Sequence, residues 1–376
     1  MEHLQKRFWA VLIMVFVVCS QAFSQSLIKK IGTLIDSMSV KGVDRRYIDA
    51  PKKPWQLILR GNMNQSSLKM KASGSIGDID YSATPYLKTD PSKYVGLWVG
   101  YRGYGLGYTV NVGGDKGQYL TFGVTGGAYG LNLRIHSFEN SHPNFGLQSN
   151  IVPEENQESW TQVQLIDPIK VRTLFLDGYY LFNGKHFSYA AAYDQSVLQK
   201  RSAGSLMVGG MYYYGRTVYA SHSNGDLIYL MNGLGKVKLW QGSVGVGYAY
   251  NWVPFRGMLV SAMAMPMITF VNKIKAYGYS TNVLELMQDP KFSDDDITDE
   301  EWDEWFYNSL RITPMGEKKF SSGITLNFDA RLSVTYNFGR YFINAYGQFN
   351  NMRYHHDNNN GYLNDWFVNT SVGIRL

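Results

Sequence analysis

The stretch WQGSVGVGYAYNW, residues 240–252, decides the fold of this chain. Read alternately, one face is apolar with aromatic residues at both ends, and the other face is small or polar. This period of two is typical of a β-strand. Residues 240–252, at ~3.3 Å each, are enough to cross a bilayer core of ~30 Å along a tilted path. The pattern therefore predicts a strand of an outer-membrane β-barrel, with the apolar face toward lipid.

Two further stretches repeat the pattern, at residues 326–338 and 366–376. In the first, Asp329 and Arg331 lie opposite a wholly apolar face, and unpaired charge is costly in the core of a soluble sandwich. A water-filled lumen accepts both side chains. In the second, the chain stops in mid-strand on an apolar residue, as outer-membrane barrels usually do.

Composition favours one barrel over a helical or α/β enzyme. Aromatic residues make up 15 % of the 376 residues, charged residues only 18 %, and there are 38 glycines. The net charge of +6 is spread along the chain without a nucleic-acid-binding motif, so no nucleic-acid partner is expected.

The N-terminus reads as a secretory signal peptide over residues 1–24. Basic residues precede the apolar run 8–18, which is too short to span a membrane, and Ala22 and Ser24 form a small-residue cleavage site. A lipoprotein reading through Cys19 is weaker because Val18 is large. Cleavage removes the only cysteine, so the mature chain has no disulfide or thiolate.

Residues 25–54 are predicted to be a periplasmic leader, and residues 55–376 the barrel. A short amphipathic helix can form over residues 26–39, and Pro51 and Pro54 end it. The leader is expected to pack near the barrel mouth, where it is available to a periplasmic partner.

About 12 strands are predicted, within a range of roughly 10 to 14. They are expected at residues 55–63, 94–102, 104–112, 118–125, 128–137, 169–182, 186–198, 205–220, 240–252, 258–274, 326–338, 341–351 and 366–376. Asn183-Gly184 predicts a tight hairpin. Counting back from a periplasmic C-terminus makes residues 278–318 and 353–363 external and the turns at 254 and 339 periplasmic. The same count makes the loop 138–158 periplasmic, although its length is typical of an external loop. One strand between residues 160 and 235 is therefore miscounted.

A family resemblance rests on particular runs of residues. YLFNGKHFS at 180–188, QKRSAGS at 199–205, the Tyr47-Ile48 lead-in and the VGIRL ending resemble the Bacteroidota outer-membrane barrel family catalogued as domain of unknown function 4421. The resemblance covers nearly all of the mature chain. It implies a barrel in the outer membrane and supplies neither an activity nor functional residues.

Two sets of residues are candidates for roles in the barrel. The residues predicted to face the lumen, where they plug a narrow barrel or set the selectivity of a small pore, are Arg60, Arg102, Asp329, Arg331 and Arg375. The residues predicted to form the aromatic girdle are Trp240, Tyr248, Tyr250, Trp252, Tyr336 and Trp366. The expected partners are outer-membrane lipid, lipopolysaccharide and the barrel-assembly machinery.

The acidic stretch 294–304 is predicted to form an external helix on the barrel rim. Thr298 and Glu301 form a capping box, and Trp302, Trp305 and Phe306 with Leu310 then share one helix face. Binding of Ca²⁺ or bridging of lipopolysaccharide is the alternative, but the glycine of a calcium-binding loop is missing.

No catalytic residue, metal site or cofactor is predicted. The adjacent His355 and His356 point to opposite sides of a strand, which spoils joint ligation with Asp357. His186 and Ser188 share a strand face but lack a nucleophile elbow. We therefore expect a structural, pore or surface-interaction protein, not an enzyme. The alternatives are an enzyme that modifies lipid or lipopolysaccharide, and an accessory barrel of a secretion or polysaccharide export system.

Overall fold

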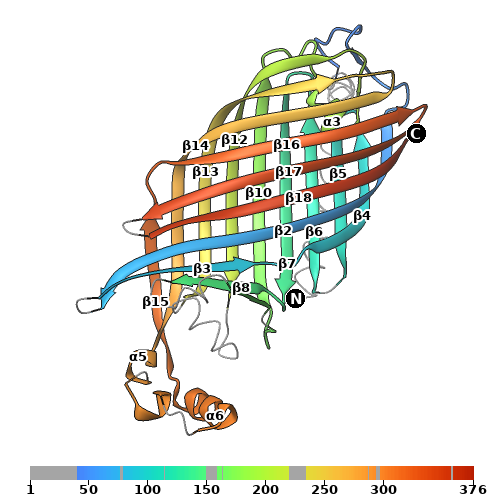
Figure 1. Ribbon diagram of the computed structural model, residues 1–376. Coiled ribbons are helices and arrows are strands. Elements are labelled where there is room, and N and C mark those ends of the chain that lie inside the picture. The colour runs from blue at the N-terminus through green and yellow to red at the C-terminus, as the bar shows by residue number, and fades with distance from the viewer. Residues whose placement is uncertain are drawn as a thin grey trace, which may run out of the picture.

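The computed structural model describes residues 40–76, 79–113, 115–149, 159–162, 164–219, 234–286, 288–293, 297–356 and 359–376. Long antiparallel strands pair in sequence order into a closed barrel, because the last strand also pairs with the first (Figure 1). The barrel strands are β2 (Trp55–Ile76), β4 (Ser92–Tyr101), β5 (Tyr104–Gly113), β6 (Gly117–Thr125), β7 (Tyr129–Asn140), β10 (Ile169–Leu181), β12 (Ala203–Val218), β13 (Leu234–Trp252), β14 (Met258–Thr281), β16 (Thr325–Phe338), β17 (Tyr341–His356) and β18 (Asn359–Arg375). The predicted all-β barrel of about twelve strands is confirmed.

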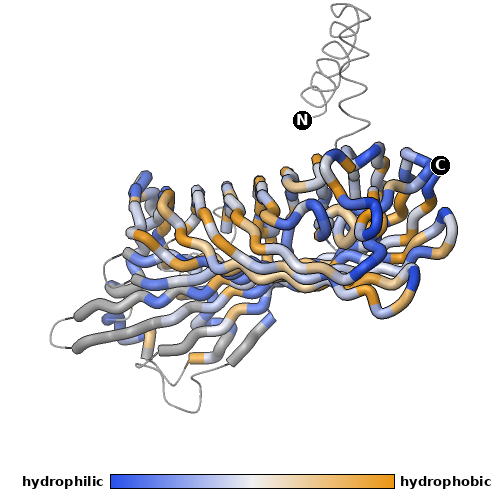
Figure 2. The backbone as a smooth tube through the Cα atoms, turned by 90° about the horizontal axis from the view of Figure 1, so that it is seen from above, coloured by the Kyte–Doolittle hydropathy of each residue, from blue (hydrophilic) through white to orange (hydrophobic). Residues whose placement is uncertain are grey.

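Hydrophobic and hydrophilic residues alternate along the strands of the wall (Figure 2), and the apolar ones are exposed on its outer face whereas the inner face is polar or small. Val246 on β13 and Leu326 on β16 are 61 % and 63 % exposed, whereas Asn251 and Thr335 on the inner faces of the same strands are 0 % exposed. Apolar side chains pointing outward around a closed barrel are stable only against lipid, so this is a transmembrane β-barrel. The described part of the chain contains no helix long and apolar enough to cross a membrane.

Several strands and helices lie beyond the barrel at the end opposite the C-terminus (Figure 1). These elements are β3 (Ile79–Lys88), β8 (Asn144–Ser149), β9 (Ser159–Gln162), β15 (Ile312–Ser321), α5 (Val283–Leu286), a 3₁₀ turn (Pro290–Ser293) and α6 (Asp299–Ser309). β15 pairs with the far part of β14 to make an arm that carries the helices. The polar stretches after residue 63 and after residue 138, predicted as loops, are therefore partly strand.

The predicted strand at residues 186–198 is wrong. The segment instead forms α3 (Tyr189–Tyr193) and the short β11 (Leu198–Gln199), which pairs with β1 (Ile48–Asp49). The reason is local: three alanines favour a helix, and the Ser188 hydroxyl accepts a hydrogen bond from the Ala191 N–H as its N-cap. The predicted hairpin at Asn183-Gly184 is absent for the same reason. Removing this strand leaves twelve and places the long connection after β7 at the same end as the β14–β15 arm.

Trp98 is packed flat against two glycines of the wall. A Cβ at Gly105 would lie 2.1 Å from the Trp98 ring, and one at Gly107 would lie 2.6 Å from it. On the lumen side, the Arg60 guanidinium lies 4.0 Å from the ring centroid. This close approach requires glycine at both positions.

Gly105→Ala is therefore expected to destabilise the barrel by about 1–3 kcal/mol, because Trp98 must leave a well-packed position. The control is Gly113→Ala on the same strand, where an added Cβ meets nothing within 4 Å. Urea-induced unfolding of the reconstituted barrels measures the difference. Equal stability of the two variants would contradict the close packing of Trp98.

Candidate functional site

Residues 182–202, which we call the plug, fold back into one end of the barrel (Figure 1). Five wall side chains on five strands donate hydrogen bonds to backbone carbonyls of the plug. They are Asn251 to Ser188 (2.8 Å), Ser333 to Ala192 (2.6 Å), Asn344 to Ala192 (3.2 Å), Gln56 to Asp194 (3.4 Å) and Arg375 to Gln195 (3.0 Å). The polar inner wall therefore serves to hold a segment of the chain's own backbone across the lumen.

Apolar side chains of the plug pack on a methionine-rich patch of the inner wall. Phe187 and Tyr189 are 0 % and 3 % exposed and belong to one buried cluster with Met263 and Met265 of β14. Full burial of each such side chain contributes roughly 2 kcal/mol. The plug is thus held by apolar packing as well as by hydrogen bonds.

Residues 40–49, which we call the leader segment, cover the plug. The Asp44 N–H donates to the Lys185 carbonyl (2.8 Å), and the Lys200 N–H donates to the Tyr47 carbonyl (2.7 Å). Ile48 is fully buried in a cluster with residues 190–192 of α3. The part of the predicted leader that the structure describes therefore lies against the plug. The predicted signal peptide and the predicted helix at 26–39 lie outside the described residues.

A charged contact reinforces this cover. A side-chain hydrogen bond from Arg46 holds the pKa of the Asp44 carboxyl well below its usual range. The same carboxylate lies 3.6 Å from Nε2 of His186 in the plug. Asp44 therefore stays ionised where it faces the plug.

An ion-pair network crosses the lumen beside α3. Nη2 of the buried Arg331 lies 2.7 Å from Asp329 on its own strand and 3.2 Å from Asp177 on β10. Arg331 also donates a hydrogen bond to the Tyr189 hydroxyl of the plug. Asp177 accepts a further hydrogen bond from Asn132 (3.0 Å). The network therefore joins β10, β16 and the plug.

The other residues predicted to face the lumen take different positions. Arg60 points inward over Trp98, and Arg375 points inward to the plug. Arg102 lies in the turn between β4 and β5 with a φ of 50°, not on a strand face, because the turn begins one residue earlier than the alternation suggests. Asp177 was not among the predicted residues, although its alternation with Phe175 and Tyr179 places it on the inner face of its strand.

The predicted girdle residues lie on the outer face, in two levels. Tyr248, Tyr250 and Trp252 are exposed near the turn that ends β13, and Tyr336 lies at the same end of the barrel. Trp240, at the other level, contacts the Tyr214 ring. Trp366, outward on β18, donates a hydrogen bond to the Gln65 side chain.

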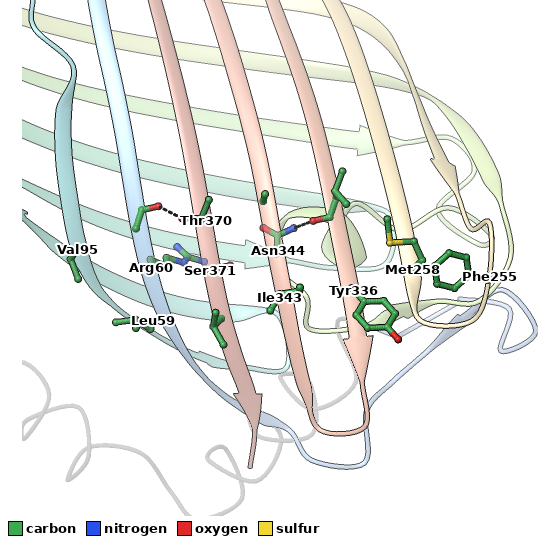
Figure 3. Close-up of a pocket in the computed structure, with 14 residues that line it drawn as sticks. Leu59, Arg60, Val95, Phe255, Met258, Tyr336, Ile343, Asn344, Thr370 and Ser371 are labelled. Carbon is green, nitrogen blue, oxygen red and sulfur yellow. Dashed lines mark hydrogen bonds between the residues drawn. The ribbon is translucent and has the colours of Figure 1, made fainter.

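Figure 3 shows a depression in this outer face. Leu59, Val95 and Ile343 line it from the lipid side, whereas Arg60 and Asn344 belong to the inner face behind it. Small residues, including Gly61, form part of its floor. The depression is almost wholly apolar, as a lipid-facing surface must be, and offers no group for chemistry.

The candidates for catalysis and metal binding are not brought together. His186 bonds to the Asn183 side chain, and Ser188 caps α3, so neither lies on a strand facing lipid. His355 contacts Asn360, and Asp357 lies outside the described residues. Within the described ranges, no three His, Cys, Asp or Glu side chains are arranged to hold a metal ion.

The acidic helix forms with the predicted capping box, but it does not pack on the barrel rim. Trp302 and Phe306 of α6 stack at 4.9 Å and form a small cluster with Leu286 and Phe292 of the same insert. The arm carries them away from the barrel (Figure 1). The insert therefore has its own small core, which residue periodicity alone does not distinguish from packing on the rim.

Thr298→Ala is expected to speed amide hydrogen exchange in the first turn of α6 on the order of fivefold, because a cap is lost. The backbone and hydroxyl hydrogen bonds from Thr298 also lower the pKa of Glu301. A lowered pKa means that the contribution is present near neutral pH and is lost as the pH falls through the range of carboxyl titration. The protection factor of the first turn, which is the intrinsic exchange rate divided by the observed rate, should therefore also fall in acid, and the variant should show a weaker pH response of this factor than the parent chain. An identical response in both would contradict the capping role of the pair.

Comparison with known proteins supports the family and little else. The profile of the family described as domain of unknown function (DUF4421) matches residues 42–375. No curated protein sequence matches the chain.

The three solved structures described next are similar to this chain only at a distance. The β domain of a Bordetella autotransporter, BrkA, has 12 % identity and a TM-score of 0.30, covering 86 % of this chain and 100 % of its own. The translocator domain of the autotransporter NalP from Neisseria meningitidis has 10 % identity and a TM-score of 0.30, covering 96 % and 99 %. An outer membrane channel from Pseudomonas putida F1 has 10 % identity and a TM-score of 0.29, covering 87 % and 97 %. TM-scores this low support no conclusion about this chain.

Proposed function

The chain belongs to the family described as domain of unknown function (DUF4421), and from its barrel we propose that it is an outer-membrane pore closed at rest by its own plug. An even number of strands and an apolar outer face fit insertion in the outer membrane by the barrel-assembly machinery, among lipid and lipopolysaccharide. The predicted signal peptide fits export to that membrane.

The plug is the observation that carries this proposal. Eight-stranded barrels are filled by wall side chains or hold one small ligand, and porins of sixteen to eighteen strands enclose an aqueous channel. In this barrel, twelve strands enclose a lumen that one inserted segment fills at a single end. The five hydrogen bonds to plug carbonyls, together with the one from Arg331 to the Tyr189 hydroxyl, help to keep that end closed, and each is weak enough to be broken by a partner.

The leader segment is the part of the chain that such a partner would bind. It pairs with the plug through β1 and β11 and makes no strand pairing with the barrel wall among the described residues. This contact also favours a role as an accessory barrel, in which a periplasmic protein opens the pore through the leader. We propose no enzymatic function, since the His and Ser candidates have structural roles in the plug.

Ile48→Asp should release the leader segment and give intermittent ionic current. The substitution places a carboxylate without a partner among the apolar residues of α3, which is unfavourable. The matched control is Arg45→Asp, at a side chain that is 58 % exposed. Limited proteolysis measures the release of the leader, and planar-bilayer recording measures current.

The parent chain and Arg45→Asp should both resist proteolysis and carry no steady current. Steady current through the parent chain would show that the plug does not close the lumen. Leader release without current would show that the leader does not control the plug.

A further inference from the structure

A second compartment lies in the lumen on the other side of the plug. It is a cavity of about 380 Å³ whose lining comes from both walls. We propose that this cavity binds an uncharged, largely apolar small molecule, and that this molecule is the cargo of the pore. The assignment as cargo rests on the proposed function; the binding site does not.

The inner wall changes character at the level of this cavity. Along β2, the inward side chains run from Arg60 and Asn62 to Leu68. Leu68 is the register partner of Leu363 on β18 and of Leu87 on β3, so three leucines lie side by side. The interior of an outer-membrane barrel is ordinarily polar because it contacts water. An apolar section of the lumen wall therefore indicates that it contacts something other than water.

Aromatic side chains line the cavity from the opposite wall. Phe138, Phe175, Tyr213 and Tyr219 contribute from β7, β10 and the β12 strand and its end, and Phe320 of β15 also lines the cavity. Rings and aliphatic side chains around a space of a few hundred Å³, with a small number of polar groups, are typical of sites for small molecules. Water bound to such walls makes few hydrogen bonds and is readily displaced by an apolar group.

The half-buried charges at this level, Arg134 and Asp365, are opposite in sign and engaged by protein groups, which favours an uncharged ligand. The Arg134 guanidinium lies 4.5 Å from the Phe175 ring centroid and 5.5 Å from that of Phe367. Asp365 accepts a hydrogen bond from the Ser66 hydroxyl (2.8 Å). Arg134 and Asp365 therefore supply one half-buried cation and one half-buried anion, both already in contact with protein groups, and the third charged residue of the lining, Lys71, is exposed. The Thr173 and Thr217 side chains, which also line it, offer hydroxyls to a ligand with one or two polar atoms.

The test is photolabelling of the intact refolded chain in lipid nanodiscs with 4-benzoylbenzyl alcohol, an uncharged benzophenone with one hydroxyl. Mass spectrometry then locates the adducts. We expect saturable labelling of peptides that contain residues 169–175 and 213–219. Labelling from the lipid side should instead rise in proportion to the probe.

Two neighbouring substitutions separate the cavity from the lipid face. Thr173→Trp fills the cavity and should lower the saturable labelling at least about tenfold. Leu174→Trp adds the same ring on the outer face of the same strand and should leave labelling unchanged. Val171→Lys, which places a charge in the cavity, should reproduce the loss if Thr173→Trp does not fold. Labelling that does not saturate, or that is equal in the two tryptophan variants, would overturn the site.

Ionic current through a chain with a shortened plug distinguishes the two proposals. Current without saturable labelling would contradict the proposed binding site but not the proposed pore. Saturable labelling in a plug-shortened barrel that carries no current would leave the site and remove its role in transport.

Discussion

Replacing residues 186–199 with a short Gly-Ser linker is expected to convert the closed barrel into a steadily conducting pore. The linker can be short because β10 and β12 are adjacent strands, with Leu181 and Met207 as register partners. The replacement removes α3 and the carbonyl acceptors of all five wall-to-plug hydrogen bonds. The lumen is then lined at that end by the polar side chains of the wall, which water can solvate.

Single-channel recording in planar bilayers measures the effect. The plug-shortened chain should give steady steps at least about tenfold above any current through the parent chain, since a twelve-stranded barrel without its plug encloses water. The control replaces residues 299–309, helix α6, with the same linker, because α6 lies on the arm outside the lumen. A plug-shortened barrel that shows heat-modifiable gel migration but no current would contradict the pore.

Removing two wall donors provides a milder variant that preserves the chain length. Ser333 and Asn344 both donate to the Ala192 carbonyl. Changing both to alanine removes about 1 kcal/mol for each hydrogen bond. Brief openings are therefore expected in place of steady conduction. Thr370→Ala, on the outer face of β18, is the matched control, and it should remain closed.

The strands were predictable from the sequence because lipid imposes a strict rule on one face. Residues 326–338 were predicted as a strand, and β16 is Thr325–Phe338, since every second residue must tolerate lipid. The plug does not contact lipid, so no such alternation is required of its sequence. Phe187, Tyr189 and Tyr193 alternate with smaller residues as they would in a strand, but Phe187 and Tyr189 are buried in the lumen and Tyr193 is partly buried there. The signals for the plug were the alanine triplet after Ser188 and the failure of strand counting upstream of residue 235.

The lumen network was only half predictable, because pairs across a lumen have no sequence spacing. Asp329 and Arg331 stand two residues apart on one polar face, and that proximity is visible in the sequence. Asp177 completes the network from the opposite wall, and only closure of the barrel brings it to 3.2 Å. The apolar cavity was missed for a related reason. The inward Val171 stands between the exposed, charged Lys170 and Arg172, so periodicity does not show which face looks into the lumen there.

Arg331→Met is expected to lower the free energy of unfolding by about 3–5 kcal/mol, because it leaves two buried carboxylates without their cation. The Arg331 and Asp329 side chains are only 7 % and 2 % exposed, so water cannot readily take the place of the guanidinium. The loss also removes the hydrogen bond to Tyr189 and should loosen the plug. Urea-induced unfolding in lipid vesicles, followed by gel migration, measures the change.

The design of the controls separates uncompensated charge from loss of packing. Arg353→Met changes an exposed arginine on the neighbouring strand and should alter stability by less than about 0.5 kcal/mol. Adding Asp177→Asn and Asp329→Asn to Arg331→Met removes both unpaired charges, so most of the stability should return. If the triple variant is no more stable than Arg331→Met alone, the network acts by packing and not by charge compensation. If stability returns while ionic current persists, the charges hold the barrel together and the Arg331–Tyr189 hydrogen bond is what holds the plug closed.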